Sequence, residues 1–251
     1  MRFLYNTWVY LDVLSSLSSG EDPYSLKFYS NNALSTPSTP TSSSAGGSSE
    51  YTLKYEIDSL LGCAIDLFPL IARMSKVANR LTEKVITQEE VVYIQKAIEV
   101  RDELLAWRPP EIDLLQESSD VNCSLEDIVR TAEVYRLTAL LHLYRTFPPL
   151  GRDIQNLADQ ILETLLVIPK ESHSLCIHIW PLMAAGCEHT DPFKRQKVCQ
   201  RFVDVRDKLM IANVDQAMDL LAEVWRRRDA GDRDAGWAKL AKERDWHILL
   251  G

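Results

Sequence analysis

Apolar residues recur at intervals of three and four positions along most of this chain, which is the spacing of a helix with one buried face. No segment alternates apolar and polar residues in the manner of a strand, and no Asn-Gly pair marks a hairpin. The sequence therefore predicts an all-α fold, a single domain of antiparallel helices joined by short connections. The predicted helices cover residues 4–17, 57–81, 87–107, 125–147, 152–168, 172–189, 192–209, 213–228 and a short stretch ending near Trp246.

The segment at about residues 172–189 is apolar on nearly every side, so it fits a position surrounded by other helices. We expect it to form the central helix, kinked at Pro181 because proline removes one amide donor. Four of its residues are candidates either for the packed core or for the wall of an apolar pocket, and the packed core is the simpler interpretation. The segment is shorter than the roughly 20 apolar residues that span a bilayer, so we expect no membrane insertion. The four candidates are Trp180, Met183, Ala184 and Gly186.

Residues that can accept hydrogen bonds from free backbone amides stand where several predicted helices begin. A proline also fits the first turn of a helix, where its missing N–H is not needed. Pro69, by contrast, falls inside the predicted helix at 57–81 and is expected to kink it. The candidate helix starts are Thr87 with Glu90, Ser124 with Asp127, Asp191 with Pro192, and Asn213.

A stretch rich in Ser, Thr, Pro, Gly and Asn interrupts the helical pattern at residues 30–52. Such a composition buries too little apolar surface to fold alone, so we expect a disordered insert. The chain is then divided into an N-terminal helical segment of the domain at 1–29, the insert, and a main helical part at 53–251. Thr36 and Thr39 each precede a proline and are candidate phosphorylation sites, although a passive spacer is the simpler interpretation.

Composition places the chain among folded, acidic proteins. It has 251 residues, of which 46% are hydrophobic, and a formal net charge of −8, so its surface should repel nucleic-acid phosphates. Any DNA contact is expected to come from elsewhere. Five scattered cysteines lack the spacing of a disulfide framework and indicate a reducing compartment, cytosol or nucleus. The N-terminus lacks the apolar core and the cleavage site of a secretory signal.

Two cysteine–histidine pairs are the nearest approach to a metal-binding motif, Cys176 with His178 and Cys187 with His189. On one continuous helix these pairs would lie too far apart along the axis to share a zinc ion. We therefore expect core thiols, capped or partly exposed histidines, and no metal. His142, between two leucines, is likewise expected to be structural rather than a catalytic base.

No other arrangement of residues indicates catalysis. The sequence has no Gly-x-Ser-x-Gly elbow, His-Glu-x-x-His zinc helix, phosphate-binding loop or dinucleotide fingerprint, and nothing brings two carboxylates together for acid–base chemistry. The basic run at 226–228 is flanked by aspartates, so we expect a solvated helix end rather than a phosphate-binding or nuclear-import patch. The chain is expected not to be an enzyme.

Four segments, taken in order, resemble the fungal-specific transcription factor domain, the C-terminal regulatory domain of fungal zinc binuclear cluster transcription factors. No one segment is diagnostic, but their order and spacing together are fairly specific. The segments are Trp8–Gly20, Ile57–Cys63, Ile179–Glu188, and Asn213–Asp229 together with Trp246–Gly251.

The resemblance implies a nuclear, all-helical regulatory module that controls RNA polymerase II transcription through co-regulators or other proteins. In that family DNA is bound by an N-terminal cluster of six cysteines holding two zinc ions. The five cysteines here show no Cys-x-x-Cys spacing, so no cofactor is expected in this chain, and DNA contact is expected only through a missing N-terminal cluster. The start at Met1, inside the family's domain, leaves three alternatives: a truncated product, a partial gene model or a stand-alone derivative.

Two functional hypotheses from different classes follow. The first is a transcription-regulatory domain that acts through protein interactions. The second is a sensor that holds a sterol- or lipid-like molecule beside Trp180, Met183, Ala184 and Gly186, and that is stabilised by its ligand through mass action. An α-helical enzyme of unknown type is a remote third hypothesis, because no catalytic residues can be named.

Overall fold

The computed structural model describes residues 2–31, 55, 57–82, 88–116, 122–151 and 153–244. Within them the chain is mainly helical, and β-type pairing is limited to two isolated bridges, Tyr55 with Leu115 and Asp58 with Gly62. The prediction of an all-α fold is thus confirmed. The α-helices are α1 Arg2–Ser19, α2 Leu26–Asn31, α3 Phe68–Thr82, α4 Gln88–Ala106, α5 Leu125–Thr146, α6 Ile154–Val167, α7 Ile179–Glu188, α8 Pro192–Leu209, α9 Ala212–Asp229 and α10 Trp237–Glu243. Short 3-10 turns are η1 Ile112–Leu114, η2 Pro148–Leu150 and η3 His173–Ile177.

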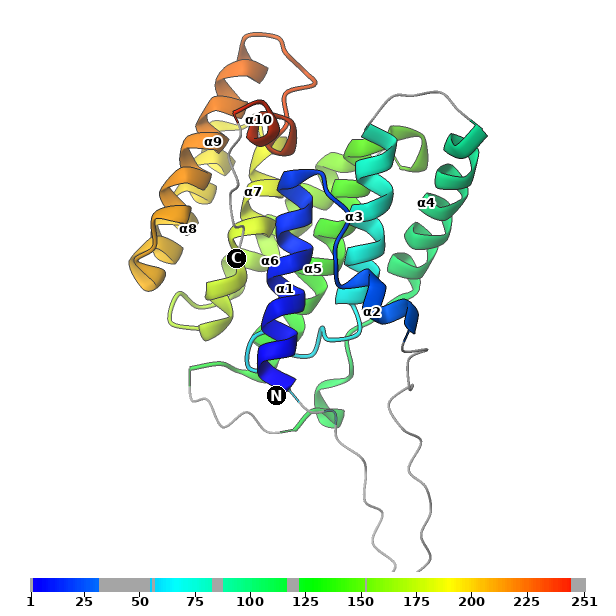
Figure 1. The fold of residues 1–251 in the computed structure, drawn as a ribbon. Coiled ribbons are helices and arrows are strands. Elements are labelled where there is room, and N and C mark those ends of the chain that lie inside the picture. The colour runs from blue at the N-terminus through cyan, green and yellow to red at the C-terminus, as the bar shows by residue number, and fades with distance from the viewer. Residues whose placement is uncertain are drawn as a thin grey trace, which may run out of the picture.

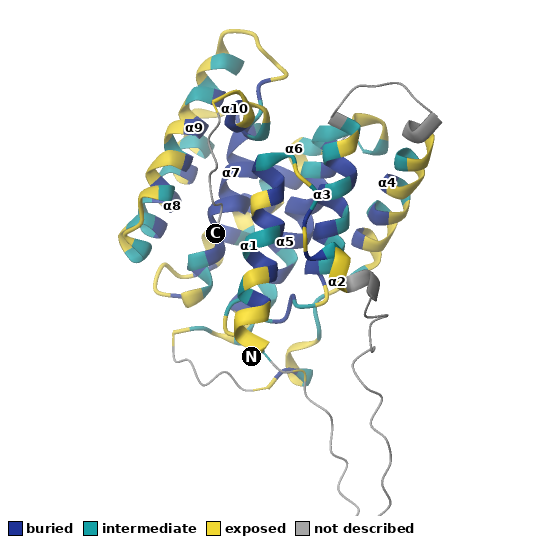
Figure 2. Ribbon diagram, in the orientation of Figure 1, coloured by how far each residue is buried: buried dark blue, intermediate teal, exposed yellow. Residues whose placement is uncertain are grey.

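The helix α7 lies at the centre of the packing, as its apolar sequence predicts. It contacts α5, α6, α8, α9 and α10, while α5 contacts α3, α4, α6 and α7. Figure 1 shows α1 in front of this pair, α3 and α4 on one side, and α8 and α9 on the other. Burial is concentrated along α5 and α7 (Figure 2). Among the described residues, each helix is too short or too polar to cross a membrane.

The segment around α7 is not one continuous helix, which corrects the expectation for residues 172–189. The turn η3 ends at Ile177, and α7 begins at Ile179, so that only His178 lies between them. Pro181 is the third residue of α7, where backbone amides have no intrahelical partner, so the proline costs no hydrogen bond there. The predicted kink at Pro181 is therefore wrong, and the interruption of the helix falls at His178, between η3 and α7.

Residues 57–67 form turns rather than the first half of a helix. The carboxylate of Asp58 accepts hydrogen bonds from the backbone amides two and three positions ahead, each at 2.9 Å, and Gly62 has a φ of 58°, a left-handed conformation that favours glycine. The helix α3 begins only at Phe68. Pro69 therefore lies in its first turn, and the predicted kink at that residue is wrong.

Two predicted helix starts are confirmed. The hydroxyl of Ser124 accepts a hydrogen bond from the amide of Asp127 at 3.1 Å, which caps α5. The carboxylate of Asp191 accepts one from the amide of Phe193 at 2.8 Å, and Pro192 opens α8. Both starts depend on chemistry within four residues, which is why the sequence reveals them.

The predicted cap at Asn213 is wrong, because α9 already begins at Ala212, after Ile211 in extended conformation. Residues 30 and 31, expected to open the insert, still belong to α2. The other expectations for this insert fall on residues outside those described, as do several named positions. These are Thr36, Thr39, Thr87 and Trp246.

A row of four buried rings crosses the core, one ring from each of α1, α3, α5 and α7. The ring centroids are 5.7 Å apart between Tyr10 and Phe68, 5.6 Å between Phe68 and Tyr135, and 5.5 Å between Tyr135 and Trp180. The hydroxyl of Tyr135 donates to the carbonyl of Ile177 at 2.6 Å and lies 3.3 Å from the hydroxyl of Tyr10. The helix α1 thus shares one hydrophobic core with the rest of the chain.

Candidate functional site

The four residues proposed for a core or pocket all lie in the interior around α7. Trp180 and Met183 are fully buried, and Ala184 is 4% exposed. At Gly186 an added Cβ would stand 3.0 Å from a methyl group of Val198 and 3.2 Å from one of Leu221, so the absent side chain lets α8 and α9 approach α7 closely. These residues are packed by neighbouring helices.

Trp180 has one unsatisfied polar group. Its indole N–H is buried and has no hydrogen-bond acceptor among the described residues. A buried donor without an acceptor costs about 1–3 kcal/mol. This nitrogen is the one buried side-chain polar atom without a partner among the four core candidates.

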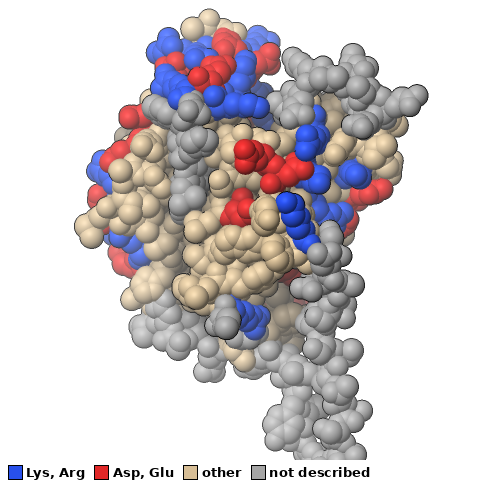
Figure 3. All heavy atoms as spheres, in the orientation of Figure 1, with Lys and Arg blue, Asp and Glu red and all other residues tan. Residues whose placement is uncertain are grey.

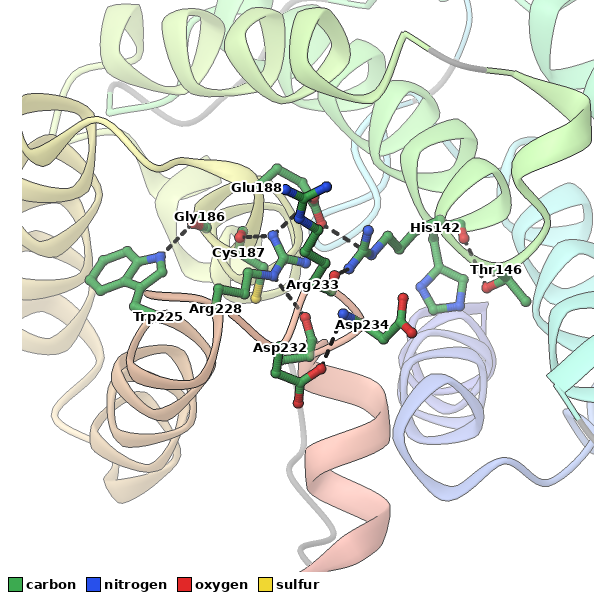
Figure 4. Close-up of polar contacts among 12 residues, drawn as sticks. His142, Thr146, Gly186, Cys187, Glu188, Trp225, Arg228, Asp232, Arg233 and Asp234 are labelled. Atoms are coloured by element: carbon green, nitrogen blue, oxygen red, sulfur yellow. Dashed lines mark hydrogen bonds and ion pairs between the residues drawn. The ribbon is translucent and has the colours of Figure 1, made fainter. Parts of the chain in front are cut away.

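The C-terminal end of α7 is closed by side chains from α9 (Figure 4). Trp225 donates its indole N–H to the carbonyl of Gly186 at 2.8 Å, and Arg228 donates to the carbonyl of Cys187. The last carbonyls of a helix lack intrahelical partners and carry the negative end of the helix dipole. A cation and an N–H donor from α9 therefore satisfy two carbonyls that burial shields from water.

The carboxylate of Glu188, the last residue of α7, is the meeting point of several helices. It accepts two hydrogen bonds from Arg228, each at 3.1 Å, and the two side chains are only 10% and 11% exposed. Arg145 of α5 approaches the same carboxylate at 3.7 Å. Arg228 also donates to the carbonyl of Ala235 at 2.8 Å, just before α10. We call Arg145, Glu188 and Arg228 the ion-pair junction.

The basic run at 226–228 is therefore not simply a solvated helix end. Arg228 belongs to the ion-pair junction, while Arg226 and Arg227 bind Glu223 at 2.7 and 3.1 Å. Their hydrogen bonds lower the pKa of Glu223 to about 2. Arg227 also reaches Glu243 of α10 at 2.9 Å. Carboxylates thus partner each of the three arginines.

His178 and His189 are buried, at 0% and 1% exposed, which corrects the expectation of capped or partly exposed rings. The Nε2 atom of His178 lies 3.1 Å from the hydroxyl of Thr131, and burial, helped by nearby Arg201, lowers its pKa to about 3. The Nδ1 atom of His189 lies 3.5 Å from the carboxylate of Asp159, but burial still lowers its pKa. Both rings are neutral core groups at physiological pH.

The cysteine–histidine pairs are not gathered into a metal centre. In the described part of the chain, no group of three or more His, Cys, Asp or Glu side chains is arranged to hold a metal ion. Burial raises the pKa of the Cys187 thiol to about 12, which disfavours the thiolate that a metal requires. His142 lies against the ring of Trp237, 5.7 Å between centroids, and burial lowers its pKa to about 4.

A shallow surface hollow of about 580 Å³ lies at the turn between α8 and α9. Its lining mixes charged and apolar side chains, and none of the four core candidates contributes to it. The hollow is open to solvent and contains no cluster of catalytic groups. Its lining residues are Arg206, Asp207, Met210, Ile211, Ala212 and Asp215.

Sequence reasoning missed the ion-pair junction. Arg228 and Glu188 are 40 residues apart, and no local pattern joins them. The sequence contains one indication of this junction, because Glu188 ends a segment that is apolar on nearly every side. A carboxylate at the end of a buried helix requires a cationic partner, and the basic run at 226–228 supplies it.

One family of known proteins matches this chain along its whole length. No curated protein and no solved structure matches it at a significant level. The model of one protein family, described as the fungal specific transcription factor domain, matches residues 1–251. Because this match covers the full length of the sequence, the chain belongs to the family of fungal specific transcription factor domains.

Proposed function

We propose that this chain is the regulatory domain of a fungal transcription factor and controls RNA polymerase II transcription in the nucleus through contacts with co-regulator proteins. The observation that carries the proposal is the family match over residues 1–251. The structure supports it with a helical body whose apolar core is shared by α1 and by α3 to α10. The ion-pair junction fixes α5, α7 and α9 against one another, which suits a scaffold for binding other proteins.

In this proposal the chain performs no reaction, and DNA contact belongs to a separate zinc cluster. The net charge of −8 opposes binding to phosphates. The arginines at 226–228, the most basic run of the sequence, are paired with Glu188, Glu223 and Glu243. Their charge is therefore largely neutralised within the fold.

A reporter assay tests the regulatory role. The chain is fused to an unrelated DNA-binding domain in a fungal host, and transcription from the matching reporter is compared with that from the DNA-binding domain alone. We expect a change in transcription that is lost in a Gly186→Leu fusion, because a leucine at Gly186 cannot fit between α8 and α9. Equal transcription from the fusion and from the DNA-binding domain alone would contradict the proposal.

DNA binding is tested separately with the purified chain. We expect no retardation of duplex DNA at physiological salt, whatever its sequence, since the paired arginines offer little free positive charge. Specific binding to one duplex by the isolated chain would show that the assignment of DNA contact to another segment is wrong.

An apolar-ligand sensor is the second candidate function, and the observation that favours it is the unsatisfied indole N–H of Trp180. A sterol- or lipid-like molecule with one oxygen acceptor would satisfy this donor. The test is a thermal-melting screen against such molecules, with Trp180→Phe as the matched variant because it removes the donor and keeps an aromatic ring. We expect a ligand to raise the melting temperature of the wild type more than that of the variant; no shift across the panel counts against the sensor.

A further inference from the structure

Two half-buried cysteines come from distant segments of the sequence that pack against each other. Cys123 stands just before α5, and Cys176 lies in the turn η3. The backbone amide of His173 donates to the carbonyl of Asn122 at 3.1 Å, and the Sγ atom of Cys123 lies 3.2 Å from the hydroxyl oxygen of Ser174. These two contacts hold the segment that contains Cys123 against η3.

Cys176 lies two residues beyond Ser174 on the same turn. In a 3-10 turn this step advances about 4 Å along the axis, and the Cα atoms of a disulfide are about 4.4–6.8 Å apart. Burial raises the pKa of the Cys176 thiol, the ammonium group of Lys208 lowers it, and the charge of Cys123 raises it further. Because the interaction between charges weakens with distance, the effect of Cys123 shows that the two thiols are neighbours. A local movement of η3 is then enough to join them.

The other three cysteines lack such a neighbour or such access. Cys63 and Cys187 are only 7% and 1% exposed, and burial raises the pKa of each thiol to about 12. Cys199 of α8 is half-buried, and burial alone raises its pKa. Among the described residues, Cys123 and Cys176 are therefore the pair of thiols best placed to react with each other.

A cation beside η3 favours the reactive form of Cys176. The ammonium group of Lys208 donates to the carbonyl of Glu171 at 2.7 Å, which holds it near the start of this turn. A nearby positive charge stabilises the thiolate, which is the nucleophilic form of cysteine. Lys208 thus opposes the effect of burial on the pKa of Cys176. We assign Cys176 as the thiol that attacks an oxidant and Cys123 as the thiol that resolves the product.

Charge indicates which class of oxidant suits this pair. The chain carries a net charge of −8, which disfavours the approach of anionic oxidants. On the face seen in Figure 3, lysine and arginine atoms are interspersed with aspartate and glutamate atoms, so that face has no broad positive area to attract an anion. A small neutral hydroperoxide is not repelled, and it can reach a half-buried thiol.

We propose that Cys123 and Cys176 form a reversible disulfide when the chain meets a hydroperoxide. The thiolate of Cys176 attacks one peroxide oxygen, so that an S–O bond forms, the O–O bond breaks, and the leaving oxygen takes a proton. The thiol of Cys123 then attacks the sulfenic sulfur, the S–S bond forms, and the S–O bond breaks to release water with the thiol proton. The two sulfur atoms together lose two electrons, and the peroxide gains them.

The disulfide would act on the start of the central helix. It ties the residue before the cap of α5 to η3, which directly precedes His178 and α7. The hydroxyl of Tyr135 on α5 already donates to the carbonyl of Ile177 at 2.6 Å, so the bond reinforces an existing contact between α5 and η3. Because it closes a long loop, it restricts the unfolded chain and should raise the melting temperature. In a reducing compartment such a bond is transient and reports oxidation.

Peptide mapping of the folded full chain tests the proposal. The chain is treated with hydrogen peroxide, its remaining thiols are blocked with N-ethylmaleimide in denaturant, and it is digested with trypsin without reductant. We expect the peptides with Cys123 and Cys176 to be linked, with the loss of two hydrogen atoms, and to separate on addition of dithiothreitol. Cys187 lies on the same tryptic peptide as Cys176 and should carry the blocking group. The melting temperature should rise on oxidation and return on reduction.

Three variants assign the roles of the thiols. Cys123→Ser should abolish the link and leave a sulfenic acid at Cys176 that dimedone labels, whereas Cys176→Ser should abolish both. Cys199→Ser is the matched control, since it removes another half-buried thiol, and it should keep the link. Circular dichroism establishes that each variant is folded, and the map of the wild type depends on none of them.

Several results would overturn the proposal. One is a folded wild type in which both Cys123 and Cys176 still carry the blocking group after peroxide treatment. Others are a link that joins a different pair of cysteines or two chains, and a link that forms only in urea. A disulfide that lowers the melting temperature counts equally against it, because such a bond would not fit the native packing of η3 and α5.

Discussion

Glu188 and Arg228 are joined by two hydrogen bonds of 3.1 Å where the last turn of α7 faces α9. The pair is nearly excluded from water, and Arg228 also satisfies the carbonyls of Cys187 and Ala235. One guanidinium therefore connects the end of the central helix with α9 and with the start of α10. Loss of this side chain should affect the whole C-terminal half of the fold.

We predict that Arg228→Met lowers the free energy of unfolding by about 3–5 kcal/mol, because it leaves the carboxylate of Glu188 buried without its main partner. The matched control is Arg226→Met, since the side chain of Arg226 is 68% exposed, and it should change stability by less than about 1 kcal/mol. Urea unfolding of the three proteins measures both values. Equal losses in the two variants would mean that the junction has no special energetic role.

Gly186→Ala is predicted to destabilise the protein by about 1–3 kcal/mol, because its methyl group would crowd Val198 and Leu221 on two neighbouring helices. Gly236 is the control, since an added Cβ there meets nothing within 4 Å, and its φ of −145° is open to alanine. Because Gly236 is the N-cap of α10, where alanine is disfavoured relative to glycine, we expect Gly236→Ala to cost less than about 1 kcal/mol. Thermal melting and urea unfolding give the comparison; a harmless Gly186→Ala would show that α8 and α9 can move apart freely.

Stability should fall as the pH drops below about 6.5, because His178 has a pKa of about 3 in the folded protein and an ordinary value of 6.5 when unfolded. Between these values the unfolded state binds a proton that the folded state does not, so each pH unit costs up to about 1.4 kcal/mol. Well above pH 6.5 this histidine is unprotonated in both states and contributes no pH dependence. His142, with a pKa of about 4, adds in the same direction.

Urea unfolding at about pH 7 and about pH 5 measures this slope, and His178→Asn should make it shallower. The variant also loses the hydrogen bond to Thr131, so its absolute stability is not the readout. An unchanged slope in the folded variant would show that His178 is protonated as easily in the native state as in the unfolded chain.

Met210→Gly is predicted to stabilise the protein by about 0.5–1 kcal/mol. Met210 is the C-cap that follows the last residue of α8, with a left-handed φ of 53°, which disfavours side chains other than glycine. Its side chain is 84% exposed, so little contact is lost on removal. Met210→Ala keeps the Cβ atom and should bring no gain, and the difference between the two melting temperatures tests the explanation.

The sequence predicts correctly those features that depend on local chemistry or on composition along one helix. Ser124 and Asp191 accept hydrogen bonds from amides two or three residues away, so their capping roles can be inferred from a few neighbouring residues of the sequence. The central position of α7 follows from the absence of any polar face. Its residues Trp180 and Met183 are indeed fully buried.

Other features depend on contacts between residues far apart in the sequence, or on backbone conformations that apolar spacing does not reveal. The apolar spacing at 57–67 fits a helix, yet Asp58 bonds to the amides that follow it and Gly62 turns left-handed, which gives successive turns. The ion-pair junction depends on packing between α7 and α9. The contact between the rings of Trp8 and Phe28 likewise depends on α2 folding back beside α1.

The row of rings from Tyr10 to Trp180 has a consequence for how the polypeptide acquires its structure. Because each ring comes from a different helix, no contiguous piece that lacks α1 or ends before α7 can complete the row. During synthesis, the complete row of rings can therefore form only after α7 has left the ribosome. A product cut within the stretch between α2 and α3 should remain loosely collapsed, and the two pieces should recover native packing only when they are mixed.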